Sequence, residues 1–173
     1  MKKVFCMLMM VMAFTMTAQA QNRFTVKAGL GASNVSDIDE TDNGLHWKLG
    51  VGYELRLSKL IGIEPSVLIS NKAFQTKVGD EDISYGYLSV PVMCNFHLGR
   101  VVLAAGPYFD FNVGKDDLGP EPKSMDGGIQ IGGKYVFDCG LNLGLECQAA
   151  CTDAFKIAGG EWVTAAAVIG WSF

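Results

Sequence analysis

The sequence predicts an all-β fold, an eight-stranded antiparallel up-and-down transmembrane β-barrel. Three observations support this prediction. Eight segments alternate apolar and polar residues with the two-residue period of a strand. The connections between the segments alternate between long and short, as in a barrel with tight turns at one end and longer loops at the other. The apolar faces carry almost no charge in mid-strand positions, as a surface in contact with lipid requires.

The first segment, residues 1–20, is expected to be a signal peptide that is absent from the mature protein. Lys2 and Lys3 form a positive start, an apolar core follows, and Ala18-Gln19-Ala20 matches an A-x-A cleavage site. The alternative is a membrane-anchor helix, but the apolar run is shorter than the about 20 residues that span a bilayer. We therefore predict export, cleavage after this site, and a single barrel domain over residues 21–173.

The clearest strand is residues 45–57, LHWKLGVGYELRL. Its odd positions form an unbroken apolar ladder from Leu45 to Leu57, with Trp47 and Tyr53 near the two ends. Its even positions hold glycine and polar or charged residues. Because successive side chains of a strand point to opposite faces, one face of this strand is apolar and the other is polar.

The remaining segments repeat this alternation along the chain. The predicted strands span residues 24–33, 45–57, 60–71, 83–97, 101–113, 126–137, 140–151 and 162–173. The predicted connections are tight turns at 58–59, 99–100 and 138–139, and long loops at 34–44, 72–82, 114–125 and 152–161. An even strand number puts both ends of the barrel domain on one side. Because an exported chain enters the outer membrane from the periplasm, we expect the tight turns to be periplasmic and the long loops to face outward.

Three prolines, Pro65, Pro91 and Pro107, fall within predicted strands. Proline belongs at sheet edges or bulges, and a closed barrel has no free edge. We therefore predict β-bulges at these three positions, or strand boundaries that differ from those given above.

The mature chain contains four cysteines: Cys94, Cys139, Cys147 and Cys151. Cys147 and Cys151 would lie on one face of one strand, about 13 Å apart at about 3.3 Å per residue. A disulfide needs Cα atoms within about 7 Å, so this pair cannot form. We interpret the four cysteines as small hydrophobic residues rather than as a disulfide framework.

The polar faces carry equal numbers of positive and negative side chains. An eight-stranded barrel is just wide enough for its interior to be filled by side chains, and interior glycines make room for long ones. Because buried charges must be paired, we expect these residues to form a structural ion network in the barrel interior. The network predicted from the sequence consists of Lys27, Lys48, Glu54, Arg56, Glu64, Asp110, Lys134 and Glu146.

A soluble, periplasmic, lipocalin-like ligand-binding barrel is the competing architecture, with the apolar faces inside. It would spread the charges thinly over the whole exterior, with glycines between them. It also gives no reason for the aromatic residues near strand ends, which membrane barrels use as girdles at the two interfaces. These aromatic residues are Trp47, Phe96, Trp162 and Trp171.

The composition excludes several classes of function. Removing Lys2 and Lys3 with the leader takes the formal net charge from −4 to −6, and no basic stripe is present to bind a nucleic acid. Eight strands leave no aqueous lumen, which argues against a channel. No cofactor is expected.

Several short motifs resemble PorT-type outer-membrane β-barrel proteins. Residues 87–92, YLSVPV, resemble the Y-L-x-x-P strand of that family, and residues 105–108, AGPY, resemble the G-P-Y strand that follows it. Residues 126–128 (DGG) and the aromatic end of residues 169–173 (IGWSF) also fit. The resemblance implies a small eight-stranded outer-membrane barrel of the OmpX and OmpA architecture. The best-known member is associated with protein secretion, but no residue here marks that role.

The sequence also offers candidate residues for a catalytic site and for a metal site. His46, at the outer end of its strand, has Ser33, Ser36 and an acidic loop nearby in the sequence, which could form a rim-active lipid hydrolase. A rim histidine in a polar interior is the simpler interpretation. The acidic residues Asp37, Asp39, Glu40 and Asp42 could hold Ca²⁺ but lack the EF-hand pattern, so a solvated loop is favoured. No catalytic residue and no metal ligand is predicted.

The expected function is therefore that of a non-enzymatic outer-membrane barrel, acting through its extracellular loops or as an envelope or secretion accessory. Its expected partners are outer-membrane lipid and an envelope protein, and it is expected to be a monomer.

Overall fold

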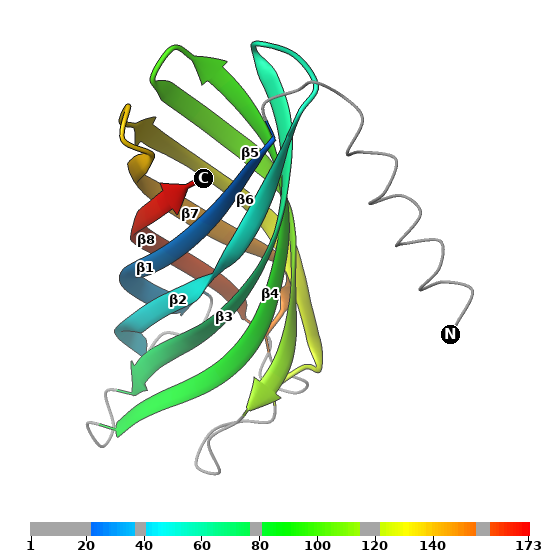
Figure 1. Ribbon diagram of the computed structural model, residues 1–173. Helices are drawn as coiled ribbons and strands as arrows, with labels where there is room; N and C mark the ends of the chain where they lie inside the picture. Colours follow the sequence, from blue (N-terminus) through cyan, green and yellow to red (C-terminus); the bar gives the residue numbers. More distant parts are fainter. Residues whose placement is uncertain (1–21, 37–40, 77–80, 115–121, 155–159) are drawn as a thin grey trace.

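The computed structural model describes residues 22–36, 41–76, 81–114, 122–154 and 160–173. Eight β-strands make up most of this part of the chain (Figure 1). Within it, no helix is long and apolar enough to cross a bilayer. The strands are β1 (Arg23–Ser36), β2 (Thr41–Arg56), β3 (Ile61–Thr76), β4 (Glu81–Leu98), β5 (Val101–Gly114), β6 (Met125–Val136), β7 (Leu141–Asp153) and β8 (Glu161–Ser172).

The strands close into a barrel in which every neighbouring pair is antiparallel, in the order β1 to β8. The closing ladder joins β1 to β8, from Thr25 opposite Ser172 to Ser36 opposite Glu161. No strand of this sheet therefore has a free edge. The predicted eight-stranded, antiparallel, up-and-down barrel is confirmed.

Three short turns lie at one end of the barrel, together with the C-terminus (Figure 1). They connect β2 to β3, β4 to β5 and β6 to β7, as predicted. Two turns use glycine in the left-handed region, Gly99 at φ 69° and Gly140 at φ 91°. A Cβ atom at Gly140 would also lie 2.6 Å from the Ser172 carbonyl oxygen, so this position needs glycine for space as well as for backbone angle. We call this the turn end and the opposite end the loop end.

The strands extend further toward the loop end than predicted. β1 and β2 take up most of the predicted loop 34–44, and β3 and β4 take up most of the predicted loop 72–82. Polar residues in these segments suggested loops, but their backbone groups continue the inter-strand ladder beyond the apolar band. A closed barrel can extend in this way into water because its ladder supplies the backbone hydrogen bonds regardless of side-chain polarity.

The bulges predicted at the three prolines are wrong. Pro65 lies opposite Val92. Three residues further along β3, Leu68 lies opposite Ser89, so the β3–β4 register is unchanged. Pro91 and Pro107 likewise pair without a register change. In an antiparallel ladder only alternate N–H groups face a given neighbour, so proline removes one hydrogen bond without requiring an extra residue. The register shifts in the described ladders lie instead at Asn43/Trp47, Gly86/Tyr87 and Ala149/Asp153.

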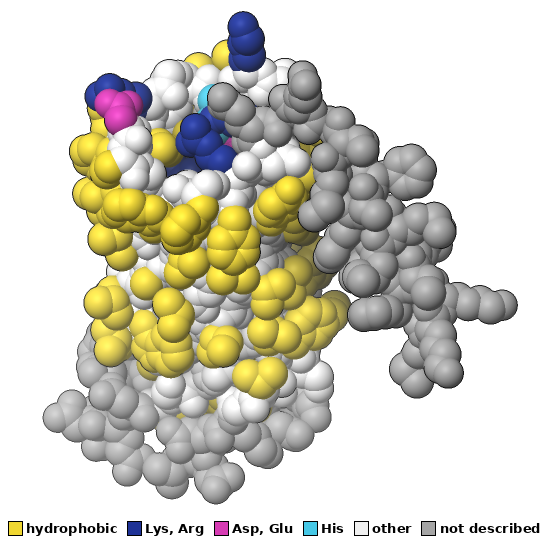
Figure 2. All heavy atoms as spheres, viewed as in Figure 1, with side chains coloured by type: hydrophobic (Ala, Val, Ile, Leu, Met, Phe, Trp, Pro, Cys, Tyr) yellow, Lys and Arg dark blue, Asp and Glu magenta, His cyan; other side chains and the backbone are white. Residues whose placement is uncertain are grey.

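The apolar face of each strand forms the outside of the barrel. Hydrophobic side chains form a broad belt across the visible face of the molecule, and charged side chains gather at the turn end (Figure 2). Leu45 and Leu145 are 64% and 67% exposed, whereas polar residues such as Ser66 are buried inside. The lipocalin-like arrangement, with its apolar face inside, is therefore wrong.

Trp162 is the exception among the predicted girdle aromatics. Trp47, Phe96 and Trp171 lie on the exposed outer face, but Trp162 is fully buried inside the barrel. The neighbouring Val163 is the exposed residue, so Trp162 takes the inward position that the strand alternation gives it. The girdle prediction for Trp162 was based on its place near a strand end, and the strand alternation overrides that criterion.

Candidate functional site

The barrel interior is the candidate site, because the polar faces of all eight strands converge there. Among the predicted network residues, Lys27, Lys48, Glu54, Glu64 and Asp110 are buried. The remaining three, Arg56, Lys134 and Glu146, are partly exposed within the interior. Their contacts form three groups along the barrel axis and one more toward the loop end.

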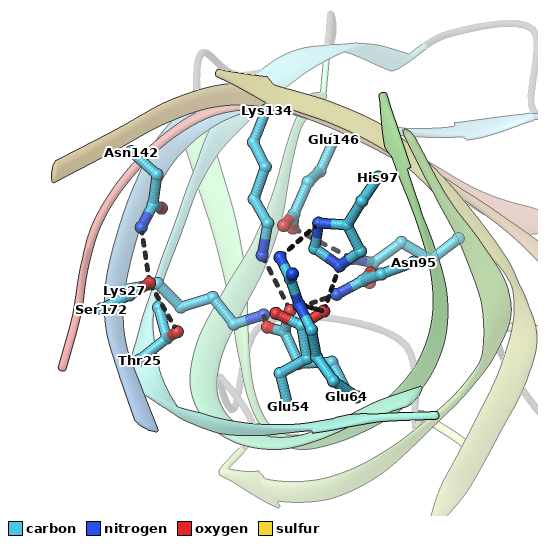
Figure 3. Close-up of polar contacts among 12 residues, drawn as sticks. Thr25, Lys27, Glu54, Glu64, Asn95, His97, Lys134, Asn142, Glu146 and Ser172 are labelled. Carbon is cyan, nitrogen blue, oxygen red and sulfur yellow. Dashed lines mark hydrogen bonds and ion pairs between the residues drawn. The ribbon is translucent and has the colours of Figure 1, made fainter. Parts of the chain in front are cut away.

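Glu64 is the centre of the first group (Figure 3). Its Oε1 accepts a hydrogen bond from Lys27 Nζ at 2.9 Å, and its Oε2 accepts one from Lys134 Nζ at 2.8 Å. Asn95 Nδ2 donates a further hydrogen bond to Oε2 at 2.8 Å. One carboxylate of β3 thus joins side chains from β1, β4 and β6 across the lumen. It places negative charge between two ammonium groups that would otherwise repel each other.

A second group runs around the wall from Lys48. Lys48 Nζ donates to Glu146 Oε2, which also accepts from Gln130 Nε2 at 3.0 Å. Gln148 Nε2 donates to Gln130 Oε1 at 2.8 Å, and Thr164 Oγ1 donates to Gln148 Oε1 at 3.1 Å. The Lys48–Glu146 contact crosses the lumen from β2 to β7, and the other bonds link the adjacent strands β6, β7 and β8.

The third group lies toward the turn end and contains His97, which was not predicted as a site residue. Arg56 Nη2 donates to His97 Nδ1 at 2.8 Å, and His97 Nε2 contacts Glu54 Oε1. A guanidinium only donates hydrogen bonds, so Nδ1 accepts and the proton of the neutral imidazole is on Nε2. His97 therefore links Arg56 to Glu54, whose direct ion-pair distance is 3.9 Å.

Of the fourth group, near the loop end, only Asp110 was predicted from the sequence, and Lys72 and Asp126 were missed. Lys72 Nζ lies 2.8 Å from Asp110 Oδ2 and 2.8 Å from Asp126 Oδ2, and all three side chains are buried. The same ammonium lies 5.0 and 5.2 Å from the ring centroids of Tyr87 and Tyr108, within cation–π range. Continuing the inward alternation of β3 from Glu64 through Ser70 would have placed Lys72 inside. Its position in a predicted loop concealed it.

An apolar cluster fills the interior next to Lys72. Phe74 and Trp162 have ring centroids 6.1 Å apart, and Tyr85 meets Trp162 edge to face at 6.3 Å. Trp162 also lies over Lys72, 5.7 Å from Nζ to the ring centroid. The lumen is therefore packed with aromatic side chains near the loop end. The cluster comprises Val35, Phe74, Ile83, Tyr85, Tyr87, Ala150, Ala154 and Trp162.

The described residues of the hydrolase alternative, His46, Ser33 and Ser36, do not form a catalytic arrangement with one another. His46 is fully buried, and its Nδ1 bonds to the Asn71 carbonyl oxygen. Ser33 Oγ donates to the Ala73 carbonyl oxygen at 2.6 Å and accepts from the Ala73 N–H at 2.8 Å. Ser36 Oγ donates to the backbone of Glu161. Each group is thus bonded to backbone rather than arranged as nucleophile and base.

The described part of the chain contains free thiols but no candidate metal centre. There, no three His, Cys, Asp or Glu side chains gather in a way that could hold a metal ion. Asp37, Asp39 and Glu40 of the acidic segment lie outside the described residues, as does the side chain of Asp42. Cys94, Cys139, Cys147 and Cys151 are free thiols.

Charge balance and packing describe what the interior can do. Adding Lys72 and Asp126 to the predicted network keeps positive and negative charges equal in number. Between the Glu64 and Glu146 groups, a cavity of about 30 Å³ is lined by Thr25, Lys27 and Asn95, among others. This volume holds on the order of one or two water molecules. Away from the turn end, the interior is therefore a paired, nearly filled polar core that links strands across the lumen.

Comparison with known proteins identifies similar folds. Residues 4–170 match a family model described as outer membrane protein beta-barrel domain. Neisserial surface protein A has a similar structure, with a TM-score of 0.56 and 12% identity over 88% of this chain and 97% of that chain. The outer membrane protein OprG from Pseudomonas aeruginosa gives 0.55 and 11%, over 89% and 96% of the two chains. A de novo designed transmembrane β-barrel gives 0.51 and 12%, over 87% and 95%. No curated protein matches the sequence.

Proposed function

Because this chain belongs to the outer membrane protein β-barrel family and is a small barrel of the outer membrane, we propose that it is a non-enzymatic, non-conducting component of the cell envelope. It acts through the surfaces at its two ends, as an accessory to another envelope protein. Its wall binds outer-membrane lipid, and it works as a monomer, without a cofactor.

The observation that carries this proposal is the filled interior. Lys72, its two aspartates and the aromatic cluster occupy the lumen near the loop end, and the Glu64 group crosses it further along. An ion entering this path would have to displace paired charges from a low-dielectric core, which is strongly unfavourable. This favours a structural core over a conducting pore.

The outer wall supports the same proposal. Its exposed side chains are apolar along the strands, which suits lipid and leaves the two ends as surfaces for polar partners. The resemblance of segments in β4, β5, β6 and β8 to PorT-type proteins supports an accessory role in the envelope.

Planar-bilayer recordings test the absence of conduction. We expect the purified, refolded protein to give no conductance steps, while an open porin reconstituted in the same bilayers does. Reproducible steps that disappear when the folded band is lost on heating would overturn the proposal.

A lipid assay tests the absence of enzyme activity. We expect lipid A and phospholipids to be unchanged after incubation with the wild-type protein and with His46→Ala. Release of fatty acid by wild type and not by His46→Ala would establish the hydrolase alternative.

The mature N-terminus completes the proposal. If the signal peptide is cleaved after Ala20, intact-mass spectrometry should give the mass of a chain that begins at Gln21. A mass that includes residues 1–20 would mean that the leader is retained.

A further inference from the structure

The turn end of the barrel contains a cavity that the proposed function does not use. Its volume is about 510 Å³, far larger than the cavity in the middle of the lumen. Three arginines from different parts of the chain line it, at the start of β1, at the end of β2 and in the β4–β5 turn. His97 and the 136–140 turn complete much of the wall. Figure 2 shows basic side chains gathered at this end of the molecule.

The three guanidinium groups retain hydrogen-bonding capacity. Each guanidinium has five N–H donors. The Arg23 side chain makes no hydrogen bond or ion pair with any residue that the structure describes, although its backbone pairs with Glu54 in the β1–β2 ladder. Arg56 Nη2 donates to His97, but its buried Nε has no hydrogen-bond partner in the described chain. Arg100 is bonded at Nη2 to Asp138 at 2.5 Å and at Nη1 to the Tyr135 hydroxyl at 3.4 Å.

Two side-chain carboxylates, Asp138 and Glu54, lie near the three arginines of this cavity. Asp138 pairs with Arg100 on the exposed rim, where both side chains are largely in water. Glu54, beneath the cavity, contacts His97 and lies 3.9 Å from Arg56 Nε. Arg23 lies opposite Glu54 in the β1–β2 register, but the two form no ion pair in the described structure. Counting the side chains of Arg23, Arg56 and Arg100 against those of Asp138 and Glu54 therefore leaves one guanidinium in excess at this end.

We propose that this arginine-lined cavity binds a phosphate-bearing anion, either a small soluble phosphate compound or the headgroup of an anionic phospholipid. Guanidinium groups match phosphate oxygens in a bidentate geometry that lysine cannot provide. Arg23 and Arg56 supply the unused donors from inside the rim, and Arg100 extends the site to its outer edge. The volume is within the range of small-ligand sites, so it accommodates a phosphate together with the group that bears it.

Titration calorimetry of the whole barrel in uncharged maltoside detergent tests the proposal, with inorganic phosphate as the first probe. The second probe is phosphatidylglycerol, compared with phosphatidylcholine in nanodiscs by native mass spectrometry. Binding of inorganic phosphate in detergent identifies a soluble source. Retention of phosphatidylglycerol over phosphatidylcholine, without phosphate binding, identifies a headgroup. Absence of both would overturn the proposal.

Variants separate the site from general charge. Arg23→Gln and Arg56→Gln should each weaken binding about tenfold or more, the effect of losing a hydrogen bond to a charged group. Lys59→Gln removes one positive charge from the same end, on an exposed residue that does not line the cavity, and should leave affinity unchanged. Arg23→Gln removes no described contact and should keep the heat-dependent gel shift of the folded barrel. Equal weakening by Lys59→Gln would mean non-specific attraction and would overturn the assignment.

Discussion

The two ends of the lumen both contain basic and acidic side chains, but one end is closed and the other contains a cavity. Near the loop end, Lys72 is held between two aspartates and covered by aromatic rings, and its side chain is 0% exposed. Near the turn end, the arginines line an open cavity and keep unused donors. The two ends therefore differ in how their cations are held: Lys72 is enclosed between two carboxylates and aromatic rings, whereas the arginines line a cavity.

The largest expected effect comes from breaking the loop-end core. Lys72→Met leaves Asp110 and Asp126 buried near each other without their cation, which should lower the free energy of unfolding by about 4 kcal/mol. The measurement is a urea titration in lipid vesicles, read from the mobility of the folded band. Lys123→Met is the matched control, because its pair with Asp153 is exposed, and it should show no measurable change. Equal effects of the two substitutions would contradict the distinction between the closed core and the surface.

Removing the aromatic cover should have the next largest effect. Trp162→Ala deletes a fully buried ring that packs on Phe74 and Tyr85, and should destabilise the barrel by about 3 kcal/mol. The same urea titration measures it. Trp171→Ala serves as the control, because that ring lies on the exposed outer wall and leaves no internal cavity. If Trp171→Ala lowers the free energy of unfolding more than Trp162→Ala does, the outer wall rather than the interior contains the aromatic packing that stabilises the barrel.

A smaller effect is expected at the middle of the lumen. Glu64→Gln leaves Lys27 and Lys134 without their shared carboxylate, and should destabilise by about 2 kcal/mol. The loss is smaller than at Lys72 because the Lys134 side chain is 21% exposed and can be hydrated. Adding Lys27→Met to Glu64→Gln should recover part of the loss. A double variant whose loss equals the sum of the two single losses would show that the pair is not coupled.

The smallest stability effect is expected at the rim of the open end. Arg100→Gln breaks an exposed pair with Asp138 and should leave the unfolding midpoint unchanged. Phosphate affinity, measured by the same calorimetry as above, should nevertheless fall. If Arg100→Gln shifts the unfolding midpoint but leaves phosphate affinity unchanged, Arg100 stabilises the fold and does not contribute to the phosphate site.

The fold was predictable because strand alternation is a local signal. The stretch from Leu45 to Leu57 shows both faces directly, and the tight turns follow from the short gaps between such stretches. Lys72 was missed because polar neighbours made its segment look like a loop, and its partners Asp110 and Asp126 lie on strands distant in sequence. Which inward residues meet depends on strand register, and a single sequence does not determine this.

The arginine cavity illustrates the same limit. Arg23, Arg56 and Arg100 each sit at the end of a strand or in a turn, and nothing in their local sequence connects them. Only closure of the sheet brings the three together. The prolines show the converse: local rules predicted bulges, but the ladder tolerates a missing N–H without changing register.

The ladder between β1 and β8 also has a kinetic consequence. Thr25 and Ser172 share a hydrogen bond although they are 147 positions apart in the sequence. Contacts between residues so far apart in the sequence form late in folding, so β1 keeps an exposed edge until β8 pairs with it. A chain with two open edges and an apolar outer face is prone to aggregate in water. Productive folding therefore depends on a bilayer, or on a chaperone that shields these edges until the barrel closes.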